Sequence, residues 1–125
     1  MKISVIGTGY VGLVTGVSLS EIGHHVTCID VNQDKVAKMQ QGISPIYEPG
    51  LSEMMTKNIN ENRLSFTTDH RQGLKHSDVI YIAVGTPENQ DGSADMSYVI
   101  QAARDIAENI QQNVIVVTKS TVPVG

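Results

Sequence analysis

Residues 2–12 read KISVIGTGYVG, and their pattern indicates the fold of the chain. Residues 2–6 form a short apolar run that is closed by a glycine, which predicts a buried β-strand. The glycines then follow the pattern Gly7-x-Gly9-x-x-Gly12, and a helical spacing of apolar residues begins within the pattern. A strand, a glycine-rich turn and a helix in this order are typical of a loop that binds the pyrophosphate of a dinucleotide.

Each glycine of this loop has a physical task. Gly7 allows the tight turn, Gly9 lets the backbone approach the pyrophosphate, and Gly12 lets the helix pack closely on the strand. The free N–H groups and the dipole at the start of the helix favour the phosphate charge. The candidate cofactor-binding residues of the loop are Gly7, Thr8, Gly9, Tyr10, Val11 and Gly12.

An acidic residue follows at the spacing that this kind of loop requires. Residues 25–30, HVTCID, predict a second strand that ends on Asp30. A carboxylate there accepts hydrogen bonds from a ribose diol and repels a 2′-phosphate, so NAD is favoured over NADP. FAD and S-adenosylmethionine also use glycine loops with an acidic residue after the second strand. NAD is favoured over both because the full dinucleotide form of the motif stands at the very start of the chain.

The rest of the chain alternates between helix and strand patterns. Helices are predicted over residues 10–23, 32–42, 51–60, 70–74 and 98–110, and further strands over 63–69, 78–84 and 113–120. Asn32 and Asp69 are placed to cap two of the helices. In the last helix, the apolar side is expected to carry Val99, Ala102, Ala103 and Ile106.

Strands that are apolar almost throughout are covered by helices on both faces of a parallel sheet. The chain is therefore predicted to be a doubly wound α/β fold of the Rossmann type, with three α/β/α layers. We expect it to form one domain over residues 1–125 that is cut after its fifth main strand.

Composition and charge exclude several classes of protein. The chain is 40% hydrophobic and 18% charged with a net charge of −4, which argues against a surface for nucleic acid. It contains no apolar run long enough for a signal peptide or a membrane span, so we expect a cytoplasmic protein with no membrane partner. The single cysteine, Cys28, excludes an internal disulfide framework and any site with several cysteine ligands.

Two further loops follow the carboxyl ends of predicted strands, where ligands bind in open α/β sheets. Gly85 lets the backbone pass close to a ligand, and Thr86 and Pro87 stiffen the turn after the fourth strand. Ser120 and Thr121 supply hydroxyls after the fifth strand, next to where a nicotinamide would lie. These hydroxyls can instead cap the turn or helix that follows, and chemistry alone leaves both interpretations open.

Four segments together resemble a known family. GTGYVGLVTG (7–16), SPIYEPGL (44–51), AVGTP (83–87) and KSTVPVG (119–125), in this order and spacing, are similar to the N-terminal domain of the nucleotide-sugar dehydrogenases, in particular those that act on UDP-glucose. The resemblance implies oxidation of a sugar C6 hydroxyl to a carboxylate with two NAD molecules, through a thioester on a cysteine. Another UDP-N-acetyl-sugar or GDP-mannose dehydrogenase, and an NAD-binding module without chemistry, remain the alternatives.

The resemblance also assigns roles to single residues. It places Lys35 beside Asp30 at the adenosine ribose, and Thr86 and Thr121 beside the cofactor. Thr121 matches a threonine that helps to position a catalytic water. Tyr47 and Glu48 belong to a loop near the cofactor and substrate cleft. For Tyr47, simple packing against the following helix is the alternative.

The nucleophilic cysteine of that family lies far downstream, in a second domain joined by a central helix. We therefore expect this chain to be an inactive fragment of a homo-oligomeric enzyme that makes polysaccharide precursors. Cys28 lies among apolar residues of a strand and is interpreted as a small buried hydrophobe. No metal site is expected, because His24 and His25 are neighbours in a turn and His70 and His76 are expected to be solvated. The acidic loop with Glu88, Asp91 and Asp95 is interpreted as a solvated turn.

Overall fold

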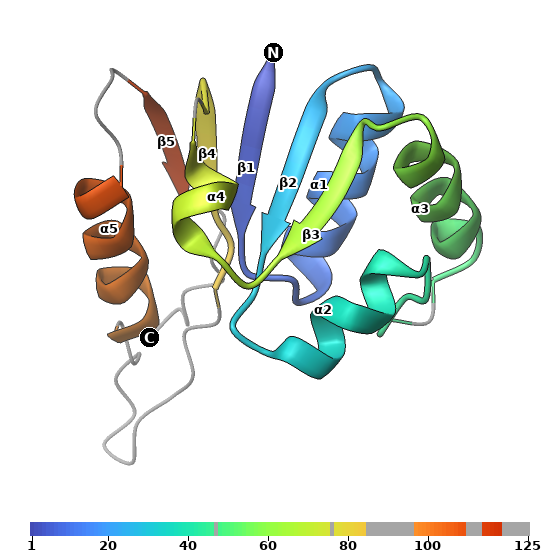
Figure 1. Ribbon diagram of the computed structural model, residues 1–125, viewed down its shortest axis with the longest axis horizontal. Helices are drawn as coiled ribbons and strands as arrows, with labels where there is room; N and C mark the ends of the chain where they lie inside the picture. The colour runs from blue at the N-terminus through green and yellow to red at the C-terminus, as the bar shows by residue number, and fades with distance from the viewer. Residues whose placement is uncertain (47, 76, 85–96, 110–113, 119–125) are drawn as a thin grey trace, which may run out of the picture.

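The computed structural model describes residues 1–46, 48–75, 77–84, 97–109 and 114–118 (Figure 1). The strands are β1 (Lys2–Ile6), β2 (His25–Ile29), β3 (Leu64–Thr67), β4 (Val79–Ile82) and β5 (Ile115–Thr118). The helices are α1 (Tyr10–Glu21), α2 (Gln33–Gln40), α3 (Leu51–Asn60), α4 (His70–Leu74) and α5 (Ser97–Asn109). Every predicted element is confirmed, with ends that differ by a few residues from the predicted ones.

The strands form one parallel sheet in the order β3-β2-β1-β4-β5. The chain runs outward from β1 through β2 to β3 and then returns to the other side of β1 with β4. This reversal makes a topological switch point at the carboxyl ends of β1 and β4, which is where ligands bind in doubly wound sheets. The predicted doubly wound order is confirmed.

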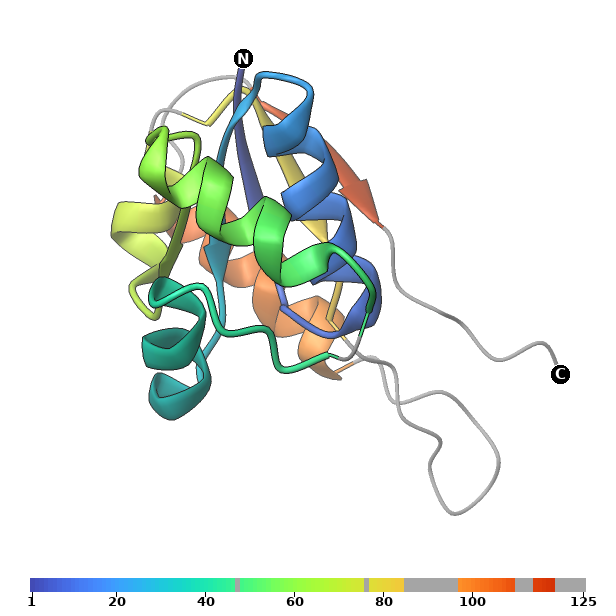
Figure 2. The ribbon, with the colours of Figure 1, turned by 90° about the vertical axis from the view of Figure 1, so that its right-hand side faces the viewer.

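Two buried clusters lie on the two faces of the sheet and make three layers. The larger cluster joins the sheet to α1, α2 and α3, and contains Leu13, Val17, Val36, Met39, Leu51 and Met55 from these helices. The smaller cluster joins the sheet to α4 and α5 through Leu74, Ala102 and Ile106. Figure 2 shows α1 and α4 on opposite sides of the sheet.

The apolar side of α5 is narrower than predicted. Ala102 and Ile106 are buried, whereas Ala103 is exposed, so its assignment to the buried side was wrong. Ala103 lies about 100° further round the helix than Ala102, beyond the part of α5 that contacts the sheet. The side chain of Val99 lies outside the described part.

The starts of the helices differ in how their free N–H groups are satisfied. Asn32 caps α2 by accepting a hydrogen bond from the Lys35 N–H at 3.0 Å, and Asp69 caps α4 by accepting from Arg71 N–H at 2.9 Å. The cap of α1 is Gly9, which has no side chain to offer. The first turn of α1 therefore leaves N–H groups free for a ligand. Of the described helices, none is long and apolar enough to span a membrane.

Candidate functional site

The glycine loop lies between β1 and α1, at the switch point of the sheet. Gly7 has a φ of +101°, and a Cβ there would lie 2.7 Å from the carbonyl oxygen of Ala83 at the end of β4. A Cβ on Gly12 would overlap the carbonyl oxygen of Gly7 and lie 3.1 Å from the Ala83 Cβ. Both glycines are thus required by the chain itself, which folds the loop, the start of α1 and the end of β4 tightly together.

Gly9 is different, because nothing in the described part of the chain requires a glycine there. Its φ of −68° and ψ of −170° suit any residue, and an added Cβ would have no described atom of the chain within 4 Å. The Cβ would instead occupy open space beside the free N–H groups of the first turn of α1. A phosphate that accepts from these N–H groups needs that space, so the loop fits a pyrophosphate.

Asp30 follows β2 directly and its carboxylate faces the glycine loop. Its Oδ2 accepts hydrogen bonds from the Thr8 hydroxyl and from the Thr8 N–H at 3.1 Å. Its Oδ1 accepts from the Asn32 N–H at 3.0 Å, and the Lys35 ammonium lies 3.6 Å from Oδ2. The structure thus brings Asp30 and Lys35 together, as the family resemblance implies, and it adds Thr8, which the sequence analysis assigned only to the glycine loop.

The electrostatics of Asp30 favour its charged form. Partial burial raises the pKa of Asp30, but the hydrogen bonds from Thr8 and Asn32 and the charge of Lys35 outweigh this effect and lower the pKa below its ordinary value. Asp30 is therefore ionised at neutral pH, and a charged carboxylate is a strong acceptor for a ribose hydroxyl.

Of the described residues 43–46 and 48–50, Glu48 reaches the start of α1 beside the glycine loop. The Ser44 hydroxyl donates to the Ile46 carbonyl at 2.7 Å, and Ile46 packs against the larger core cluster. Glu48 is thereby presented at the carboxyl edge of the sheet, where its Oε2 accepts from the hydroxyl of Tyr10 at 3.4 Å. Tyr10 and Val11 are exposed beside it. Tyr47, also predicted to belong to this site, lies outside the described residues.

The remaining predicted site residues also lie outside the described part: Gly85, Thr86, Pro87, Ser120 and Thr121. The strands that lead to them do run toward the glycine loop. Ile82 of β4 pairs with Ile6 of β1 and with Thr118 of β5, and the Ala83 N–H donates to the Ile6 carbonyl at 2.8 Å.

The structure tests what the sequence predicts for Cys28 and for two of the histidines. Cys28 is fully buried, and burial raises the pKa of its thiol to about 12, which confirms a small buried hydrophobe and not a nucleophile. His70 was predicted to be solvated, which is wrong: its Nε2 lies 3.5 Å from Asp105 Oδ2, where α4 packs on α5. His25 begins β2 and does not lie in a turn. His76 and the acidic loop lie outside the described residues.

In the part of the chain that the structure describes, no three His, Cys, Asp or Glu side chains are placed to hold a metal ion.

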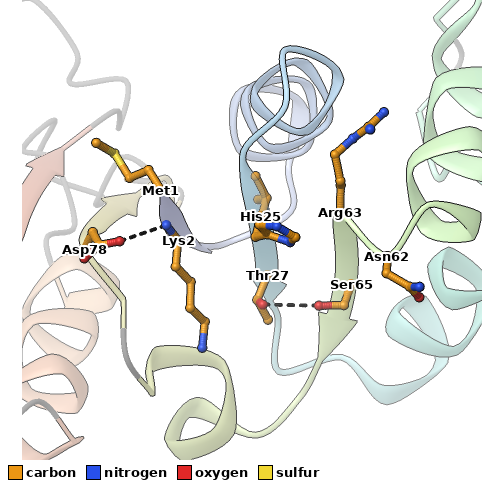
Figure 3. A pocket seen from close by; sticks show the side chains of 9 residues that line it. Met1, Lys2, His25, Thr27, Asn62, Arg63, Ser65 and Asp78 are labelled. Carbon is orange, nitrogen blue, oxygen red and sulfur yellow. Dashed lines mark hydrogen bonds between the residues drawn. The ribbon is translucent and has the colours of Figure 1, made fainter.

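A hollow of about 470 Å³ lies at the edge of the sheet opposite the glycine loop (Figure 3). It is formed at the amino ends of β1, β2 and β3 and is lined by Met1, Lys2, His25, Val26, Thr27, Asn62, Arg63, Ser65 and Asp78. Several of its polar groups bind one another: the Lys2 N–H donates to Asp78 Oδ2 at 2.9 Å, and the Thr27 and Ser65 hydroxyls are 3.2 Å apart. Sequence patterns gave no signal for this hollow, because it depends on strand register.

Comparison with known proteins identifies the family. The profile of the UDP-glucose/GDP-mannose dehydrogenase family, NAD binding domain, matches residues 1–125. The UDP-glucose 6-dehydrogenase YwqF of Bacillus subtilis is 59% identical over 125 residues, which are 100% of this chain and 28% of that protein.

Solved structures agree with the sequence comparison. A UDP-glucose dehydrogenase from Pyrobaculum islandicum superposes with a TM-score of 0.91 at 42% identity, over 98% of this chain and 29% of that one. A GDP-mannose dehydrogenase from Pseudomonas aeruginosa superposes with a TM-score of 0.93 at 41% identity, over 98% and 29%. The chain thus spans less than a third of the length of these relatives. It belongs to the UDP-glucose/GDP-mannose dehydrogenase family, as its NAD-binding domain.

Proposed function

We propose that the full-length protein is a UDP-glucose 6-dehydrogenase, for which residues 1–125 supply the NAD-binding domain. The reaction takes the C6 hydroxyl of UDP-glucose to the carboxylate of UDP-glucuronate by way of the aldehyde. Each of the two oxidation steps transfers one hydride to one NAD, and a water supplies the second carboxylate oxygen. The observation that carries the proposal is the 59% identity to a UDP-glucose 6-dehydrogenase along the whole chain.

The described residues support the binding of NAD, which supplies the hydride acceptor. The free N–H groups at the start of α1 and the open space at Gly9 fit the pyrophosphate. The ionised carboxylate of Asp30 fits the adenosine ribose diol, and Lys35 stands beside it. Gly85, Thr86, Pro87 and Ser120 are proposed to border the cofactor, and Thr121 to position the water. Tyr47 and Glu48 are proposed to border the substrate.

The cysteine chemistry is proposed to come from outside this chain. A thiol that traps the aldehyde must be exposed and readily ionised, whereas Cys28 is fully buried with a pKa of about 12. We propose a central helix and a C-terminal substrate domain that carry the nucleophile and the sugar pocket. We further propose a cytoplasmic homo-oligomer whose product is a polysaccharide precursor.

The test is turnover by the full-length protein with UDP-glucose, GDP-mannose and UDP-N-acetylmannosamine in turn. We expect two NADH for each UDP-glucose consumed and none from the other two sugars. If only GDP-mannose gave NADH, the protein would instead be a GDP-mannose dehydrogenase, the other activity in the name of its family. The similarity to the Pseudomonas aeruginosa enzyme supports this alternative. NAD binding without NADH from any sugar would favour a module without chemistry.

Cofactor choice has its own test. We expect NAD to bind more tightly than NADP, because a 2′-phosphate would meet the charged carboxylate of Asp30. Asp30→Ala should narrow the difference. Equal affinity of the unmodified protein for the two cofactors, measured by isothermal titration calorimetry, would refute the assignment of Asp30.

A further inference from the structure

Thr8 stands inside the glycine motif, yet its side chain does not face the cofactor space. The residue is only 1% exposed, whereas its neighbour Tyr10 is 58% exposed. Its hydroxyl donates to Asp30 Oδ2, which also accepts from the Thr8 N–H at 3.1 Å. Thr8 therefore reaches the proposed ribose subsite only through Asp30.

The carboxylate of Asp30 is held at both oxygens before any ligand arrives. A carboxylate offers about four lone-pair sites. At Oδ2, Thr8 fills two of these with its N–H and its hydroxyl, and at Oδ1 the Asn32 N–H fills one at 3.0 Å. The free site remains on Oδ1. The side chain of Asp30 is 15% exposed, so a ribose reaches it from one side.

We propose that Thr8 is a positioning residue for cofactor selection: its buried hydroxyl fixes the carboxylate of Asp30 so that the free site on Oδ1 accepts the 2′-hydroxyl of the adenosine ribose diol. This rests on the proposed NAD-binding role of Asp30. A carboxylate that is already oriented loses less conformational freedom when it binds the diol, and this gain belongs to ligands that carry the diol. The same hydrogen bond helps to lower the pKa of Asp30.

The experiment uses the full-length protein and compares Thr8→Val with Thr8→Ser. Valine keeps the shape and the backbone N–H of Thr8 and removes only the hydroxyl, whereas serine keeps the hydroxyl. The ligands are NAD and a 2′-deoxy form of NAD that lacks one hydroxyl of the adenosine ribose. Isothermal titration calorimetry gives the Kd for each combination of protein variant and ligand.

We expect Thr8→Val to weaken NAD by about tenfold, the effect of losing one hydrogen bond to a charged group. The same change should weaken binding of the 2′-deoxy form by less than about twofold, because this ligand lacks the hydroxyl that the oriented carboxylate would accept. Thr8→Ser should restore NAD binding to within about twofold. In Thr8→Val, NAD affinity should also begin to fall at a higher pH on acidification, because Asp30 takes up a proton more readily without this donor.

A matched control is Ser20→Ala, which removes another buried hydroxyl at the far end of α1, where it donates to the Val17 carbonyl at 2.7 Å. It should leave both Kd values unchanged. Equal losses for NAD and its 2′-deoxy form in Thr8→Val would overturn the inference and leave Thr8 a structural residue of the loop. An unchanged Kd for both would overturn it too. Failure of the unmodified protein to bind NAD would instead overturn the proposed function.

Discussion

At the scale of single residues, the three motif glycines differ in what excludes a side chain. At Gly7 the exclusion comes from a φ of +101° and from the Ala83 carbonyl, and at Gly12 from the Gly7 carbonyl. At Gly9 the described chain leaves the space open. Folding thus requires a glycine at Gly7 and Gly12, and we propose that ligand binding requires it at Gly9.

This difference predicts that Gly9→Val abolishes NAD binding while the fold survives. The valine side chain would occupy the space of the pyrophosphate, but replacing Gly by Val at an N-cap costs the helix only about 1 kcal/mol. Calorimetry and the circular dichroism spectrum of the same sample check both parts. Gly7→Val is the control, and it should lose structure as well as binding. A Gly9→Val protein that is folded and still binds NAD would contradict the site.

Glu21 gives a residue-scale prediction about pH. Its carboxylate accepts hydrogen bonds from Lys57 Nζ and from Asn58 Nδ2, each at 2.8 Å. Asn58 belongs to α3 and is fully buried. The hydrogen bonds from Lys57 and Asn58 lower the pKa of Glu21 below its ordinary value of 4.5. A lowered native pKa stabilises the fold fully above pH 4.5, and the contribution is lost as the pH falls through the native pKa.

Glu21→Gln should therefore be less stable than the unmodified protein at pH 7 and equally stable well below pH 4.5. Urea unfolding at a series of pH values measures the difference. A gap between the two proteins that persists undiminished into acid would show that the charge of Glu21 is not its cause.

At the scale of elements, α1 approaches β2 so closely that the Cys28 sulfur alone determines how a substitution at Gly16 affects stability. A Cβ on Gly16 of α1 would lie 2.7 Å from the Cys28 sulfur, which is fully buried. The next neighbours are ordinary contacts, at 3.5 Å from Val26 Cγ1 and 3.7 Å from Val5 Cγ2. The space at Gly16 is therefore taken by the sulfur alone.

The effect of Gly16→Ala on the free energy of unfolding should change sign when the Cys28 sulfur is removed. In the unmodified protein, the overpacked methyl should cost about 1–3 kcal/mol, which outweighs the gain in helix propensity. In the Cys28→Ala background the methyl has room, and the same change should stabilise by up to about 1 kcal/mol. Urea unfolding of the four proteins completes the cycle. Destabilisation of equal size in both backgrounds would contradict the packing described here.

The elements also show what sequence can and cannot predict. Strand, helix and cap patterns are local, so the glycine loop, Asp30, Asn32 and Asp69 could all be predicted from the sequence. The exposure of Ala103 and the contact of His70 with Asp105 depend on how α4 and α5 pack, which no local pattern contains. The hydrogen bonds of Thr8 with Asp30 likewise join residues 22 positions apart. They could be identified only from the structure, in which β1 pairs with β2.

At the scale of the whole molecule, the chain places a glycine loop and Asp30 on a doubly wound sheet, and it spans less than a third of the length of its relatives. Both faces of the sheet carry buried clusters, and the glycine loop and Asp30 meet at the switch point. β5 lies at one end of the sheet, with Ile115 and Val116 64% and 46% exposed. In the full-length relatives, the matched region is only 28–29% of the protein. We expect further parts of the full-length protein to cover these side chains.

The 125-residue chain by itself should therefore bind NAD and yet form no NADH with any nucleotide sugar at any pH. Binding needs the glycine loop and Asp30, which the chain contains. Oxidation to the acid also needs a base, an ionisable thiol and a sugar pocket, and the only thiol here is fully buried with a pKa of about 12. Calorimetry with NAD establishes first that the chain is folded and competent, and NADH absorbance with UDP-glucose then measures turnover. The full-length protein at equal concentration is the positive control. NADH produced by the isolated chain would show that the catalytic groups lie within these residues.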